Sequence, residues 1–139
     1  MAAEAGEPGS ILVEDARLLA NDALPGGHYL LRVAAPGIAA RARPGQFVHL
    51  RCGPELPLRR PLSILRASPR DGVVEVLYKA VGAGTRLLAT RQAGETLSVI
   101  GPIGRPFELD PGRPHVLAIG GGVGMPPMLF LAERLRGTP

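Results

Sequence analysis

The chain has 139 residues, of which 45% are hydrophobic and 20% are charged, a composition typical of one globular domain. Its net charge of +4 comes from Arg residues spread along the chain with only 4% aromatic residues, so we expect no nucleic-acid partner. No apolar run approaches the ~20 residues that span a bilayer, and the first residues do not resemble a secretory signal, so we expect a cytoplasmic protein.

Glycine and proline residues punctuate the chain. After an expected flexible tail at 1–9, short apolar runs separated by Gly and Pro predict strands at 10–19, 29–34, 46–52, 61–67, 73–81 and 96–101. Pro36-Gly37 is predicted to be a turn, and a short helix is expected at 86–91 with Thr85 as its cap. This pattern predicts a mainly-β fold, a small closed barrel that occupies residues 10–110.

The pattern changes after Pro114. His115 to Ile119 is a continuous apolar run, which predicts a strand buried on both faces in a parallel sheet. A glycine-rich turn (Gly120, Gly121, Gly122 and Gly124) and an apolar helix at 128–136 follow. One βα unit cannot bury its own faces, so residues 111–139 are predicted to open an incomplete nucleotide-binding α/β domain, and the apolar stripe of the helix favours oligomerisation.

Two segments have the composition of anion-binding sites. In Arg60-Pro61-Leu62-Ser63 a guanidinium, the preferred partner of a diphosphate, precedes a hydroxyl on an extended segment. The segment from Leu77-Tyr78-Lys79 to Gly84-Thr85 joins an aromatic ring to a helix start, where free N–H groups favour an anion. A surface Arg pair and an ordinary capped helix are the alternatives. Together the two segments make a dinucleotide such as FAD plausible.

Metal chemistry has little support in the sequence. Cys52 is the single cysteine, and His28, His49 and His115 lie on different predicted elements, so no metal site is expected. Cys52 is expected to be a small core residue.

Four motifs in order carry a family resemblance: RPLS at 60–63, LYK to GAGT at 77–85, IGPIGRPF at 100–107 and GGGVGMPP at 120–127. The set resembles the ferredoxin-reductase-like flavoproteins, most closely the electron-transfer subunits of dihydroorotate dehydrogenase. The resemblance implies a six-stranded antiparallel Greek-key barrel that binds FAD, followed by a domain that binds NAD(H).

The resemblance also implies roles for individual residues. Arg60 would hold the FAD pyrophosphate, Leu62 would pack near the flavin ring, and Ser63 would be the catalytic group, bonded to the reactive edge of the flavin. Pro61 would belong to the same cofactor-binding site. Leu77, Tyr78 and Lys79 would line the rest of the cofactor. Gly84 and Thr85 would bind the pyrophosphate, and Gly120, Gly121, Gly122 and Gly124 would form a floor for NAD(H).

The family's electron path implies more than these residues. Electrons would pass from NADH through FAD and a [2Fe–2S] cluster to the FMN of a partner dihydroorotate dehydrogenase catalytic subunit, in pyrimidine biosynthesis. A cluster of this type requires four Cys ligands, and this sequence has one. FAD binding is therefore the function expected first, NADH oxidation second. A non-catalytic barrel that binds another protein, or less readily nucleic acid, is the alternative.

Overall fold

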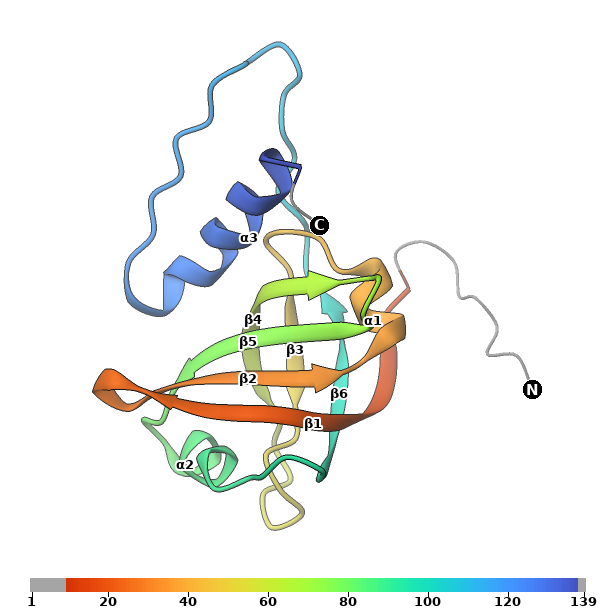
Figure 1. The fold of residues 1–139 in the computed structure, drawn as a ribbon, viewed down its shortest axis with the longest axis vertical. Coiled ribbons are helices and arrows are strands. Elements are labelled where there is room, and N and C mark those ends of the chain that lie inside the picture. Colours follow the sequence, from red (N-terminus) through yellow and green to blue (C-terminus); the bar gives the residue numbers. More distant parts are fainter. Residues whose placement is uncertain (1–9, 138–139) are drawn as a thin grey trace, which may run out of the picture.

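The computed structural model describes residues 10–137, which form a closed β-barrel with three short α-helices (Figure 1). The strands are β1 (Leu12–Leu24), β2 (His28–Ala34), β3 (Phe47–Leu50), β4 (Arg60–Ser68), β5 (Val73–Lys79) and β6 (Thr96–Ile103). The helices are α1 (Pro36–Arg41), α2 (Ala83–Ala89) and α3 (Met125–Leu135), with short 3-10 turns η1 (Pro25–Gly27) and η2 (Gly122–Gly124).

The strand order around the barrel is β1-β2-β5-β4-β3-β6, and every pair is antiparallel. Because β3 and β4 return between β5 and β6, the connection is a Greek key, as the family resemblance implied. Closure comes from β1 and β6, which pair from Leu12 opposite Gly101 to Arg17 opposite Thr96. The sheet therefore has no free edge along this seam.

Alternation along the strands fills the barrel interior. On β5 the buried residues are Val74, Val76 and Tyr78, and on β3 they are Val48 and Leu50, in each case at every second position. Period-two burial is what a strand with one face on the core requires. The sequence prediction of a mainly-β barrel is therefore confirmed.

The turn predicted at Pro36-Gly37 is wrong, because these residues begin helix α1. The carboxylate of Glu14 on β1 accepts hydrogen bonds from the N–H groups of Gly37 (3.0 Å) and Ile38 (2.8 Å). These are first-turn N–H groups that no helix can bond internally, so a side chain distant in sequence completes the helix start.

Helix α2 also differs from the prediction. It begins at Ala83, three residues earlier than expected, with Gly82 at the cap position and Thr85 inside the first turn. The predicted role of Thr85 as the cap residue is therefore wrong.

Beyond β6 the chain leaves the barrel in a long connection and returns as α3, which packs on β4 (Figure 1). The strand predicted at 115–119 is wrong: this segment lies outside any sheet, and Val116, Leu117 and Ile119 are 45%, 85% and 80% exposed. A lone apolar run becomes a strand only beside a partner, and no strand among residues 10–137 pairs with it. Within the same range, no helix has the length and hydropathy to cross a membrane.

Candidate functional site

Strands β4 and β5 separate at one end of the barrel. They pair with each other only from Ile64 opposite Val76 to Ser68 opposite Val73. Before Ile64, β4 pairs with β3 alone, and the end of β5 pairs with β2. The two strands therefore diverge like a fork, and the space between them is not closed by sheet hydrogen bonds.

A pocket of about 390 Å³ occupies this fork. Its volume lies within the range of about 300–1,000 Å³ usual for small-molecule sites. It is lined by residues of β4, β5, the start of α2 and the turn η2: Arg60, Pro61, Leu62, Ser63, Leu77, Tyr78, Lys79, Val81, Thr85 and Val123. The structure thus brings together eight of the predicted site residues at one place.

Arg60 lies directly against the first turn of α2. A Cβ atom added to Gly84 would lie 2.5 Å from Nε of Arg60, so only glycine leaves room for the guanidinium there. The Nη1 group of Arg60 donates to the carbonyl oxygens of Leu58 (3.2 Å) and Arg59 (3.4 Å). The side chain is thereby held at the pocket, with other N–H groups of its fork left for an anion.

Arg59, the neighbouring arginine, is used differently. Its two terminal nitrogens donate to the carbonyl oxygen and the hydroxyl of Ser98, both at 2.8 Å. Ser98 lies on β6, so Arg59 joins the start of β4 to the strand on the other side of β3. Of the adjacent pair, only Arg60 lines the pocket.

Thr85 points its hydroxyl at its own helix start. The oxygen accepts hydrogen bonds from the N–H groups of Val81 (3.0 Å) and Gly82 (3.1 Å). This bonding replaces helix bonds that those first N–H groups lack. The hydroxyl expected to bind an anion is therefore already engaged by the backbone.

Tyr78 contributes to the pocket wall, but its ring is almost fully buried, with 1% exposed. Its hydroxyl donates to Oδ1 of Asn21 (2.9 Å), and Nδ2 of Asn21 donates to the carbonyl oxygens of Leu88 and Arg91. Burial raises the pKa of Tyr78 well above its ordinary value, and the hydrogen bond that its hydroxyl makes with Asn21 opposes that effect. The neutral phenol thus fixes the end of α2 to the barrel.

Leu77 and Lys79, which precede and follow Tyr78 on β5, lie on the outer face of the strand. Leu77 is half-buried and Lys79 is exposed, so an apolar wall ends at a cationic rim. On β4, Pro61 is exposed while Leu62 and Ser63 are partly buried. The pocket combines apolar walls with two positive side chains, Arg60 and Lys79, a combination suited to a planar ring that carries phosphate groups.

The glycine-rich turn reaches the pocket through Val123, which is 57% exposed. Its glycines do not line the pocket themselves. Gly120 packs on the start of α3, since an added Cβ would lie 3.0 Å from Cγ of Met128, whereas Gly121, Gly122 and Gly124 face open space. Val81 and Val123 lie within the motifs at 77–85 and 120–127, but no role was expected of them, and Asn21 lies outside every motif.

Cys52 is a core residue, as expected, with no exposed surface. Burial raises the pKa of its thiol, and the positive charge of Arg60 partly offsets that effect. Among residues 10–137, no group of three or more His, Cys, Asp or Glu side chains is arranged to hold a metal ion.

Curated proteins that are similar to this chain in sequence include electron transfer subunits of one enzyme. The chain is 40% identical over 125 residues to the electron transfer subunit of dihydroorotate dehydrogenase B (NAD(+)) of Desulforamulus reducens, covering 88% of this chain and 48% of that protein. The corresponding subunit of Bacillus caldolyticus is 38% identical over 111 residues, which is 77% of this chain and 43% of that protein. The chain thus spans about half the length of these relatives. No family model matches it.

Comparison by structure finds the same kind of fold. The NADH-dependent reduced ferredoxin-NADP oxidoreductase, described for flavin-based electron bifurcation, superposes with a TM-score of 0.80 at 28% identity, over 90% of this chain and 45% of that one. The ferredoxin reductase of carbazole 1,9a-dioxygenase gives a TM-score of 0.75 at 28% identity, over 89% and 39%. The resemblance read from the four motifs is confirmed by both comparisons.

Proposed function

We propose that this chain, which is related by sequence to the electron transfer subunits of dihydroorotate dehydrogenase B and by fold to ferredoxin reductases, binds FAD in the fork between β4 and β5. The observation that carries the proposal is that Arg60, Leu62 and Ser63 of β4 line one pocket together with Leu77 of β5, at the point where the two strands diverge. The family resemblance implies that the same residues hold FAD.

Each part of the pocket has chemistry that suits a part of FAD. Arg60, lodged against Gly84, would bond the pyrophosphate through its free N–H groups. Leu62 and Leu77 provide apolar surface for a planar ring, and Lys79 adds a positive charge at the rim. Thr85 would act by shaping the α2 start, because its hydroxyl is bonded to the backbone.

When bound, FAD supplies the ability to accept a hydride and to pass electrons on singly. The task of the chain is to bind and orient it. Ser63 would donate a hydrogen bond to the reactive edge of the ring, and Pro61 and Leu62 would exclude water from one side. Ser63 is in this proposal the catalytic residue.

Residues 111–139 would open the NAD(H)-binding domain, with Gly120, Gly121, Gly122 and Gly124 giving the nicotinamide nucleotide close approach to the backbone. Val123 beside the flavin pocket supports this arrangement, because hydride transfer needs the two cofactors in contact. NAD(H) would be the electron donor or acceptor.

The proposal for the rest of the electron path is based on the similarity to the electron transfer subunits. The partner would be a dihydroorotate dehydrogenase catalytic subunit that holds FMN, and the process would be pyrimidine biosynthesis. The residues of this chain do not fit a [2Fe–2S] cluster, since Cys52 is buried and is the single thiol. No step through a cluster is assigned to this chain.

The test is a titration of the purified 139-residue chain with FAD, followed by desalting and a visible absorption spectrum. Retained flavin bands in the parent, and their loss in Arg60→Ala with an unchanged circular dichroism spectrum, are the expected result. A parallel titration with FMN separates recognition of the adenylate half from recognition of the ring. A folded parent that retains no flavin contradicts the proposal and favours a barrel that only binds another protein.

A further inference from the structure

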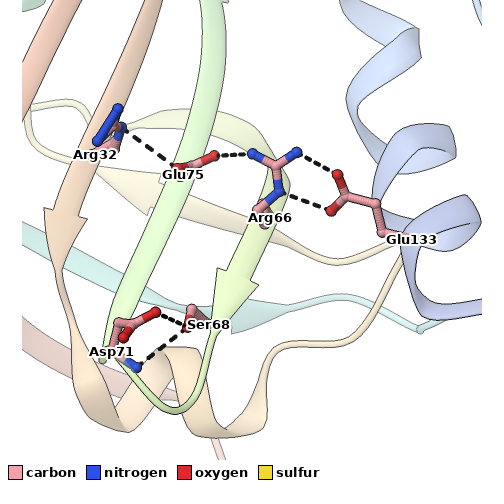
Figure 2. Close-up of polar contacts among 6 residues, drawn as sticks. All are labelled: Arg32, Arg66, Ser68, Asp71, Glu75 and Glu133. Carbon is pink, nitrogen blue, oxygen red and sulfur yellow. Dashed lines mark hydrogen bonds and ion pairs between the residues drawn. The ribbon is translucent and has the colours of Figure 1, made fainter. Parts of the chain in front are cut away.

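An ion-pair chain runs across the outer face of the barrel and ends on α3 (Figure 2). Arg32 on β2 lies 3.5 Å from Glu75 on β5, and the other oxygen of Glu75 lies 2.8 Å from Nη1 of Arg66 on β4. Arg66 then bonds both oxygens of Glu133 on α3, from Nε at 2.8 Å and from Nη2. Three strands and one helix are joined in a single row of alternating charges.

The two hydrogen bonds between Arg66 and Glu133 fix the orientation of the two side chains relative to each other. Two parallel N–H groups meet two carboxylate oxygens, and this fork holds the angle between the partners as well as their distance. Glu75 accepts a hydrogen bond from Nη1, the third nitrogen of the same guanidinium, and this bond orients the other two nitrogens toward α3. Each of the three guanidinium nitrogens of Arg66 thus bonds a carboxylate, and 39% of its side chain is exposed.

Apolar contacts attach α3 without setting its register. Phe130 and Leu131 are buried, with 2% and 7% exposed, and α3 packs mainly on β4. Apolar contact is not directional, so such a helix can slide or rotate at small cost. The fork at Glu133, together with a longer hydrogen bond from Nη2 of Arg134 to the carbonyl oxygen of Ala42 (3.4 Å), restricts that freedom.

The start of α3 is continuous with the glycine-rich turn. Helix α3 begins at Met125, directly after η2, and η2 also contacts β5. Gly120 packs tightly on Met125 and Met128, so the turn and the first helical turn move together. Val123 within this turn lines the pocket between β4 and β5. Because a helix is stiff over three turns, the position of Glu133 determines where Val123 lies.

We infer that Arg66 and Glu133 are positioning residues that hold α3 in one register on β4 and thereby hold Val123 and the glycine-rich turn at the mouth of the pocket. The identity of the ligand affected rests on the proposed function, whereas the anchoring itself does not. Glu75, braced by Arg32, acts through Arg66.

The test measures the position of the turn directly and without cofactor. Spin labels are placed on Gly121→Cys, where a side chain meets open space, and on Asp22→Cys, an exposed position of β1. Cys52 is buried and stays unlabelled. The parent pair is expected to give one narrow distance distribution by pulsed electron paramagnetic resonance. Glu133→Gln is expected to broaden it, because an amide cannot accept the charged fork at both atoms.

A matched control is Glu108→Gln, which removes the same charge from the exposed connection outside the ion-pair chain. It is expected to leave the distribution narrow. Arg66→Lys keeps the positive charge and loses the fork, so it is expected to broaden the distribution as Glu133→Gln does. Far-ultraviolet circular dichroism shows that each variant is folded. A distribution that stays narrow in folded Glu133→Gln overturns the inference.

The unlabelled variants then report the consequence for the pocket. Glu133→Gln is expected to raise the FAD dissociation constant by roughly 2- to 30-fold, the range typical of residues coupled to a site through packing. An unchanged constant with a broadened distribution overturns the statement that the anchoring serves the pocket. If the parent binds no FAD, the proposed function fails, and the distance distributions still decide the anchoring.

Discussion

Gly84 and Arg60 lie so close that a single methyl group does not fit between them. A Cβ atom on Gly84 would approach Nε of Arg60 to 2.5 Å and its Cζ to 3.0 Å. A glycine in the first turn of α2 thus determines where a guanidinium on β4 rests.

Gly84→Ala should therefore move Arg60 out of the pocket and leave the barrel intact. The atom displaced belongs to a flexible side chain, so the cost in stability is expected to be small. The FAD dissociation constant should rise about tenfold, as expected for a lost hydrogen bond between charged groups. Isothermal titration with FAD measures this change.

Gly82→Ala is the matched control for that measurement. It alters the same turn of α2, but its added Cβ meets nothing within 4 Å. A small loss of stability is expected because alanine is a poor N-cap residue, with FAD affinity unchanged. Equal affinities in the two glycine variants would contradict the role given to Arg60.

Substitution of the two adjacent arginines is expected to affect different properties, the stability of the fold for Arg59 and the affinity for FAD for Arg60. Arg59→Ala removes two hydrogen bonds to Ser98 and should lower the free energy of unfolding by about 2 kcal/mol, leaving FAD affinity largely intact below the melting transition. Arg60→Ala should weaken FAD binding with a small effect on unfolding. Urea denaturation and FAD titration of both variants check this. A reversed pattern would place the cofactor contact on Arg59.

The Tyr78 hydroxyl is expected to be structural. Tyr78→Phe leaves Oδ1 of Asn21 without this donor in a partly buried site and should cost about 1–3 kcal/mol of unfolding free energy. Tyr29→Phe retains the ring stack, whose centroids are 5.4 Å apart, and should cost less. Thermal melting compares the two. Equal melting temperatures would show that the bond to Asn21 adds no stability.

The pair on α3 should give stability a defined pH dependence. The hydrogen bond from Arg66 lowers the pKa of Glu133 below its ordinary value of 4.5, with partial burial opposing and the Arg66 charge reinforcing the shift. Because the pKa of Glu133 is lower in the folded state, its ionised carboxylate stabilises the folded protein at pH values above the ordinary pKa. This contribution is lost as the pH falls through the folded pKa. Glu75 shares the same guanidinium, and Arg134 is the adjacent charge on α3.

The measurement is the difference in melting temperature between the parent and Glu133→Gln. It should be constant from pH 7 down to about pH 5 and should shrink below pH 4.5. A contribution of about 1 kcal/mol is expected, because solvent screens a partly exposed pair. Growth of the difference at acidic pH would contradict the assignment.

The strands are well predicted from the sequence, because the alternation of apolar and polar residues that marks a strand can be read within a short segment. The sequence pattern mistakes the start of α1 for a turn, since the group that completes this helix is Glu14, far away on β1. It also predicts a strand at 115–119 from apolar composition alone, whereas strand formation depends on a neighbour. Local patterns identify elements, and partners remote in sequence decide their ends.

The same division holds at the pocket. Arg60 and Ser63 could be singled out because their residue types and spacing carry chemistry. Val123 could not, because it reaches the pocket only through the position of α3. The hydroxyl of Thr85 was expected to bind the pyrophosphate, but it is engaged by the backbone at the start of α2. Tyr78 was expected to line the cofactor, and its hydroxyl is bonded to Asn21. Which polar groups remain free for a ligand depends on the folded contacts.

The pairing of the first strand with the last has a consequence for how the chain acquires its fold. During synthesis β1 emerges early, yet its second neighbour, β6, is made only after every other strand of the barrel. Until then β1 presents unpaired backbone N–H and C=O groups along one side. Contacts of such long sequence separation form slowly, since the intervening chain must first lose its freedom. The nascent protein therefore passes through an open sheet that is exposed to association with other chains.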